Sequence, residues 1–119
     1  MNYKELLKTI IDNIESNNYS YDCSNGGFIY SKEITAVFKI LNDDSIRKIY
    51  DENIDNYTYN DKKELDQKRN PQSYSLVDCV IYFYWVWHLD GSGIASGIIF
   101  RRIKEGKYLE ALKRLYDVI

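Results

Sequence analysis

The fold is decided by the stretch 75-SLVDCVIYFYWVWHLDG-91, which contains the longest apolar run of the chain, Cys79 to Leu89. Ser75 and Asp78 have the spacing of a capping box, which opens a helix. The run is apolar on every side, as a buried helix is, but its β-branched and aromatic residues also alternate as in a strand. We predict a central helix, because the flanking segments look helical and a lone strand would have no partner. An α+β fold with a strand at 79–89 is the alternative.

Five further segments carry apolar residues at helical spacing, so each is predicted to be an amphipathic helix. They run over residues 2–17, 31–41, 44–54, 95–106 and 108–119. Together with the central run they predict an all-α fold. We expect one globular domain, 1–119, of about five or six helices with a buried central apolar helix.

The segments between these helices are turn-rich or polar. Residues 19–27 contain Asn25-Gly26-Gly27, the strongest turn signal of the chain. Residues 57–74 carry only Leu65 and Pro71 besides polar residues and tyrosines. This composition predicts a long loop with at most one helical turn, at 62–68. Loops of that length are uncommon and are often functional.

Composition excludes several classes of protein. Of the 119 residues 45% are hydrophobic and 29% are charged, a globular rather than a disordered balance. The apolar run is about half the length that a membrane-spanning helix needs, and the opening MNYKELLK lacks the apolar stretch of a signal peptide. The net charge of −2 argues against general nucleic-acid binding. We expect a cytoplasmic protein that binds neither a membrane nor a nucleic acid.

Residue types for catalysis and metal binding are few. Cys79 and His88, the only histidine, lie nine residues apart, which puts them on opposite faces of a helix or of a strand. Cys23 and Cys79 lie far apart without a metal-ligand spacing, and we expect free thiols rather than a disulfide. We therefore expect no enzyme, no cofactor and no metal site. A small enzyme with a site near His88 and Asp90 ranks third among the functional hypotheses.

The glycine pattern Gly91-x-Gly93-x-x-x-Gly97 resembles a phosphate-binding turn, because it precedes a predicted helix. Its spacing departs from the standard fingerprint, and the chain has too little sheet for such a site. We predict instead a helix start capped by Ser92, with Gly97 allowing a neighbouring segment to approach closely.

Charge and tyrosine are unevenly distributed. Residues 42–66 hold eight acids against four bases, whereas residues 97–119 hold six bases against three acids. Twelve tyrosines are present, and Tyr57, Tyr59 and Tyr74 lie in polar segments. Tyrosine is enriched in protein interfaces, and interleaved acids suit a basic partner. The predicted partner-binding residues are Asp43, Asp44, Asp51, Glu52, Asp55, Tyr57, Tyr59 and Asp61.

A small, acidic, cysteine-poor domain rich in Ile, Asn, Lys and Tyr and lacking catalytic residues resembles bacterial toxin-immunity proteins, including those of contact-dependent growth inhibition. The likeness covers the whole chain in character and rests on no single motif. It implies a stoichiometric inhibitor that binds a cognate protein toxin, often a basic nuclease. The alternative is an adaptor or regulatory module, such as a phage-encoded inhibitor of a host defence protein.

Overall fold

The long apolar segment is a helix over its whole length, α6 (Leu76–Gly91), in the computed structural model, which describes residues 1–119. Its capping box is complete: Asp78 N–H donates to the Ser75 hydroxyl at 3.0 Å, and Ser75 N–H donates to the Asp78 carboxylate at 3.1 Å. Most of its residues are buried on all sides. The prediction of a buried central helix is confirmed, and the strand alternative is wrong.

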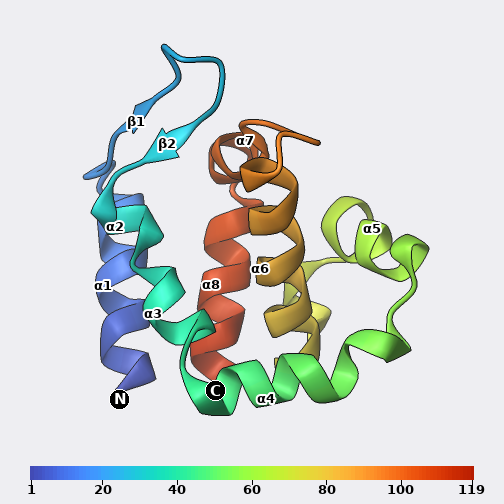
Figure 1. Ribbon diagram of the computed structural model, residues 1–119. Coiled ribbons are helices and arrows are strands. Elements are labelled where there is room, and N and C mark those ends of the chain that lie inside the picture. Colours follow the sequence, from blue (N-terminus) through green and yellow to red (C-terminus); the bar gives the residue numbers. More distant parts are fainter.

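Helices from both ends of the chain surround α6 (Figure 1). They are α1 (Tyr3–Glu15), α2 (Lys32–Thr35), α3 (Val37–Leu41), α4 (Asp44–Asn53), α5 (Tyr59–Gln67), α7 (Ile98–Glu105) and α8 (Lys107–Val118). α8 packs between α1 and α6, while α4, α5 and α7 pack against α6 from other directions. α4 crosses one end of the bundle, where both chain termini also lie (Figure 1). The all-α prediction is therefore confirmed.

The number of α-helices is eight rather than five or six. One addition arises because the predicted helix 31–41 is divided at Ala36 into α2 and α3. The other is α5, which lies in the stretch 57–74 that the composition predicts as a loop. That prediction is wrong because a capping box of Thr58 and Asp61 starts a helix there, and Leu65 anchors it in the core.

Two short 3-10 turns complete this region, η1 (Ile54–Asn56) after α4 and η2 (Pro71–Ser73) before α6. Tyr74, which follows η2, is fully buried, and its hydroxyl donates to the Leu65 carbonyl. Tyr74 therefore belongs to the core, and the sequence-based interpretation of it as an interface tyrosine is wrong.

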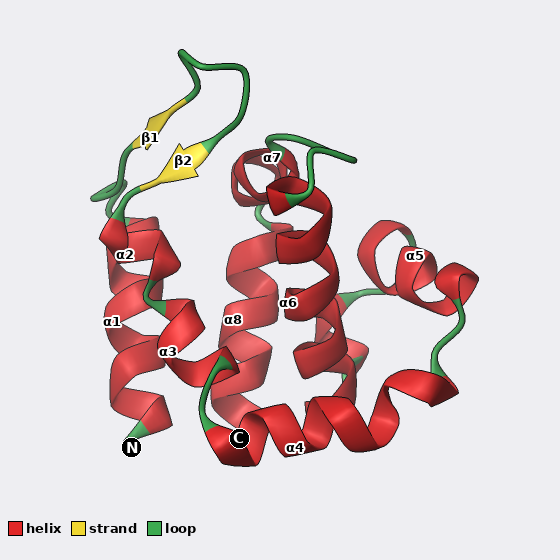
Figure 2. Cartoon of the chain, viewed as in Figure 1, coloured by secondary structure: helices red, strands yellow, loops and turns green.

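The turn-rich segment after α1 is a small hairpin. β1 (Tyr21–Asp22) pairs antiparallel with β2 (Ile29–Tyr30), and these are the only strands (Figure 2). The hairpin projects from the end of the bundle opposite α4. Its position matters because β2 delivers the Tyr30 side chain to the turn between α6 and α7.

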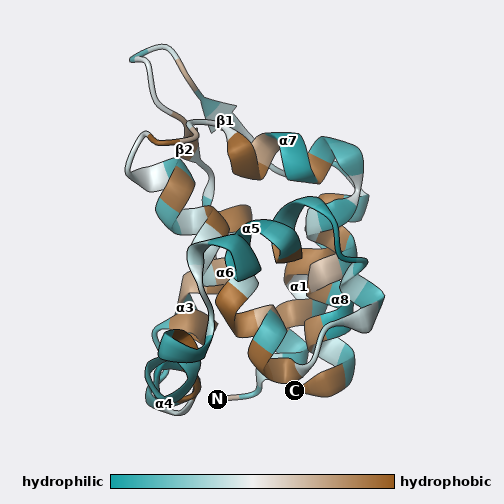
Figure 3. Ribbon diagram, turned by 90° about the vertical axis from the view of Figure 1, so that its right-hand side faces the viewer, coloured by the Kyte–Doolittle hydropathy of each residue, from teal (hydrophilic) through white to brown (hydrophobic).

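Hydropathy separates the inner from the outer helices. In Figure 3, α5 and the outer side of α4 are mostly hydrophilic, whereas α6 is mostly apolar. α4 buries only Ile46 completely, and α5 buries Leu65 and Asp66. None of the helices combines the length and the apolar character needed to cross a lipid bilayer.

Candidate protein-binding site

The eight predicted partner-binding residues lie on consecutive segments, from the start of α4 through η1 to the start of α5 (Figure 1). Three of them stabilise the fold directly. Asp43 is the N-cap of α4 and accepts a hydrogen bond from Ser45 N–H. Asp61 accepts from Thr58 N–H in the capping box of α5. Tyr57 is half-buried, and its hydroxyl donates to Asp78 at 2.6 Å.

The other five predicted residues are exposed. They are Asp44, Asp51, Glu52, Asp55 and Tyr59. Only Glu52 forms an ion pair, with Lys48 at 3.9 Å, and both partners are well exposed. Such a pair contributes little to stability. We call Asp44, Asp51, Glu52 and Asp55 the acidic edge.

A groove that we did not predict adjoins this edge on the exposed face of α6. Tyr84 and His88, one helical turn apart, border two hollows of about 220 and 260 Å3. The first hollow is lined by Tyr50, Ile54, Lys62, Ile81 and Trp85 besides the shared pair. The second is lined by Phe38, Leu41, Asn42 and Trp87 besides the same pair. We call the two hollows together the aromatic groove.

Packing between aromatic rings holds the groove in shape. Tyr50 stacks on Tyr84 with ring centroids 4.1 Å apart, and the Tyr84 hydroxyl donates to the Leu41 carbonyl. Phe38 lies against Trp87 at 4.5 Å, and the Trp87 indole N–H donates to the Tyr108 hydroxyl at 3.0 Å. The walls are therefore preorganised by contacts with α3, α4 and α8, which lowers the entropy cost of binding.

One residue of the acidic edge, Asp51, acts electrostatically on the tyrosines of the groove wall. Burial raises the pKa of both Tyr50 and Tyr84 above the ordinary tyrosine value, and the negative charge of Asp51 raises the pKa of both further. The positive charge of Arg47 acts in the opposite direction on the pKa of each. Asp51 therefore lies close enough to influence the groove wall, beside one exposed base.

The start of α5 covers the other wall. Tyr59, 66% exposed, meets Trp85 edge-on at 5.3 Å, and Lys62 Nζ lies 5.4 Å from the Trp85 ring centroid. Trp85 itself is only 9% exposed, and its indole N–H has no hydrogen-bond partner. Tyr59 thus presents an exposed ring at the rim of the groove.

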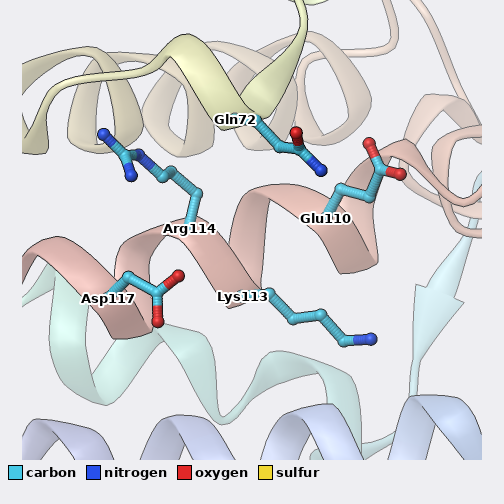
Figure 4. Close-up of a pocket in the computed structure, with 5 residues that line it drawn as sticks. All are labelled: Gln72, Glu110, Lys113, Arg114 and Asp117. Carbon is cyan, nitrogen blue, oxygen red and sulfur yellow. The ribbon is translucent and has the colours of Figure 1, made fainter.

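A larger hollow of about 450 Å3 lies between η2 and α8. In Figure 4, Gln72 enters it from η2, while Glu110, Lys113, Arg114 and Asp117 come from α8. Lys113 and Arg114 point apart: the first pairs with Glu15 at 3.3 Å, and Arg114 Nε donates to the Tyr74 carbonyl at 2.7 Å. Its charges are mixed and do not converge, so we do not choose it as the site.

The basic C-terminal third is largely committed to internal contacts. Arg102 is paired with the buried Asp66, Lys107 Nζ donates to the Arg69 carbonyl at 2.9 Å, and Arg114 holds Tyr74. The predicted contrast between an acidic middle and a basic end is therefore smaller on the surface than in the sequence. Arg101, Lys104 and Lys113 are the exposed bases of α7 and α8.

The two residues of the enzyme alternative have separate surroundings. His88 is exposed in the aromatic groove. Asp90 is buried, and its carboxylate accepts three hydrogen bonds: from the Tyr30 hydroxyl at 2.7 Å, Gly97 N–H at 3.2 Å and Ile99 N–H at 3.0 Å. Asp90 therefore fastens β2 to the start of α7 rather than serving as an ordinary turn residue.

The glycine turn has this same structural role. Ser92 ends α6 instead of starting a helix, and α7 begins after Gly97, which has a φ of +82°. A Cβ atom at Gly97 would lie 2.5 Å from the Phe28 ring. The predicted close approach at Gly97 is confirmed, whereas the predicted cap at Ser92 is wrong.

A fourth hollow, lined by Tyr57 and Arg69, contains the Asp78 carboxylate, whose charge is stabilised by its neighbours. Asp78 accepts from the Tyr57 hydroxyl, from Ser75 N–H and from Arg69 at 3.1 Å. Burial acts to raise the pKa of Asp78, but these hydrogen bonds and the charge of Arg69 outweigh burial and lower it below 3.8.

This lowered pKa predicts an acid-dependent loss of stability. The contribution of Asp78 is complete above about pH 4 and is lost as the pH falls through the lower folded-state pKa. Asp78→Asn should cost about 1–3 kcal/mol at neutral pH and flatten the decline below pH 4. Urea unfolding of both proteins across the acid range measures this. Equal pH slopes would show that Asp78 titrates alike when folded and unfolded.

Comparison of the chain with protein-family models, curated proteins and solved structures found no match. The function is therefore inferred from the geometry and charge of the surface.

Proposed function

We propose that this protein is a stoichiometric inhibitor that binds a cognate protein toxin with a basic surface, as bacterial immunity proteins do, and that it acts in the cytoplasm. The observation that supports this proposal is the acidic edge next to a preorganised aromatic groove. The edge supplies three carboxylates without an ion pair, at Asp44, Asp51 and Asp55. The groove supplies tyrosine and tryptophan, the residue types that dominate binding energy in protein interfaces.

Charge gives this surface a physical reason to choose a basic protein. Unpaired carboxylates on a helix that buries little apolar surface repel one another, and an oppositely charged partner relieves that repulsion. A nuclease must present basic groups to phosphates, so its active surface is a natural target. An acidic inhibitor docked there competes directly with the nucleic acid.

The adaptor hypothesis differs in the expected affinity. An inhibitor must remain bound, which requires a dissociation constant of about 1 nM or lower, whereas a regulatory adaptor can work at about 1 μM. Titration calorimetry with the partner that copurifies from the source cell distinguishes the two. Inhibition of the partner's activity at one equivalent of the protein is the result expected for an immunity protein.

Reversal of the acidic edge tests where the partner binds. The triple variant Asp51→Lys, Glu52→Lys and Asp55→Lys should slow association with the purified partner at least about tenfold at low salt and less at high salt, because steering is screened. Folding should hardly change, since the three side chains are exposed. Stopped-flow association rates at several salt concentrations give the result.

The matched control reverses Arg101, Lys104 and Lys113 to Glu, an equal and opposite change of charge on exposed residues of α7 and α8. Lys107 and Arg114 are left intact because they hold backbone carbonyls. If only the control variant binds slowly, the interface lies on α7 and α8 and the placement on the acidic edge is wrong.

A further inference from the structure

We propose that the aromatic groove receives an amphipathic α-helix of the partner, with the apolar face of that helix on α6 and basic side chains toward the acidic edge. This inference rests on the proposed function, because it specifies how the partner of the same surface is recognised.

The ridge and hollows of the groove have the shape of a surface against which a helix packs. Tyr84 and His88 are four residues apart on α6, so their side chains follow one another along the helix and form a ridge. The two hollows share this ridge, the first also bordered by Trp85 and the second by Trp87. Helices pack by placing the side chains of one in the grooves beside the ridges of the other. Two hollows beside an i, i+4 ridge therefore fit apolar side chains from successive turns of a helix.

The size of the hollows agrees with this occupant. Each is larger than one aliphatic side chain but smaller than a typical small-molecule pocket, which spans about 300–1,000 Å3. Both are lined mainly by apolar and aromatic side chains, whereas the hollow beside η2 has no apolar lining. Apolar side chains are thus the groups that gain most by entering the groove.

The charges around the groove determine which residues are favoured on the sides of the bound helix. Asp51 acts on both Tyr50 and Tyr84, and Glu52 and Asp55 continue the exposed acids along the same chain segment. The bases near the groove are Arg47 and Lys62, and the latter lies over the Trp85 ring. The four acids of the edge outnumber the two bases of the same segment, Arg47 and Lys48, and only Glu52 is ion-paired. Lysine or arginine on the flank of the helix is therefore favoured over glutamate.

The test uses two synthetic peptides of about 18 residues, with leucines on one helical face and either lysine or glutamate at the remaining positions. Titration of the full chain is followed by the indole N–H signals of Trp85 and Trp87 in NMR spectra, since each tryptophan borders one hollow. The lysine peptide should shift both signals and bind at least about tenfold more tightly than the glutamate peptide.

A variant that fills the groove, compared with a matched control, tests whether the peptide binds in the groove. Asn42 is exposed at the second hollow, and its side chain forms no hydrogen bond, so Asn42→Phe should fill that hollow without unfolding the protein. It should weaken the lysine peptide at least about tenfold, whereas Asn60→Phe, on the exposed side of α5, should leave binding unchanged.

The inference is overturned if the lysine peptide shifts neither indole signal at about 1 mM, if both peptides bind equally, or if Asn42→Phe binds as the wild type does. The proposed function fails independently. In that case the peptide result holds, but no partner loses activity in the presence of the protein. If instead the partner is inhibited and Asn42→Phe inhibits it equally well, the function stands and the helix-binding groove does not.

Discussion

Replacing Asp66 with alanine should lower the free energy of unfolding by about 3–5 kcal/mol, because it leaves a largely buried guanidinium without its main partner. The Asp66 side chain is 1% exposed and accepts two parallel hydrogen bonds from Arg102, at 2.6 and 2.8 Å. This geometry is the strongest form of carboxylate–arginine pair. Glu105, which also accepts from Arg102 at 3.1 Å, is half exposed and replaces only part of the lost interaction.

Replacing both partners with apolar residues separates the contribution of the ion pair from the cost of leaving one buried charge unpaired. The double variant Asp66→Leu, Arg102→Met should be substantially more stable than Asp66→Ala, since neither buried charge remains. Urea unfolding of the wild type, of Asp66→Leu, of Arg102→Met and of the double variant gives the coupling energy. Additive single-variant effects would show that the pair contributes no specific interaction.

Alanine at Gly97 should cost about 2–4 kcal/mol, from two causes that act together. The φ of +82° is unfavourable for any side chain, and the new Cβ atom would meet the Phe28 ring at 2.5 Å. Phe28 cannot move freely, because its ring packs against those of Tyr21, Tyr30 and Phe100. Thermal and urea unfolding of the purified variant measure the loss.

Gly93 provides the matched control, because it has nearly the same φ, +80°, but no other group lies within 4 Å of the place that a Cβ atom would take. Gly93→Ala should therefore cost only the backbone strain, about 1 kcal/mol. The difference between the two alanine variants isolates the collision with Phe28. Equal losses at both positions would mean that the Phe28 ring yields without cost.

The helices with a local signal were the ones that the sequence could predict. The capping box of Ser75 and Asp78 indicates the start of α6 within a span of four residues. Asn2 caps α1 by accepting from Glu5 N–H. The helix α5 was missed although Thr58 and Asp61 have the same spacing, because the apolar pattern after them is weak. One of its two buried residues, Asp66, is an acid whose partner Arg102 lies 36 positions further along the chain.

The candidate site was predictable only in part, for a related reason. The exposure of Asp51 and Glu52 follows from the pattern of one helix, and Asp55 lies in the 3-10 turn directly after it. The half-burial of Tyr57 does not follow from a local pattern, since it depends on Asp78 in another helix. The aromatic groove is formed by α3, α4, η1, α5 and α6 together, so no single segment carries a signal for it.

The Asp90 carboxylate also links the hairpin to the first turn of α7, at the end of the bundle opposite α4. It holds the first amides of α7, and the Tyr30 hydroxyl that donates to it also accepts from Phe100 N–H at 3.1 Å. Neither the hairpin nor the first turn of α7 can detach without breaking bonds of the other. The Tyr30–Asp90 hydrogen bond closes a loop of sixty residues. We therefore expect the hairpin and α7 to unfold locally as one cooperative unit rather than to fray independently.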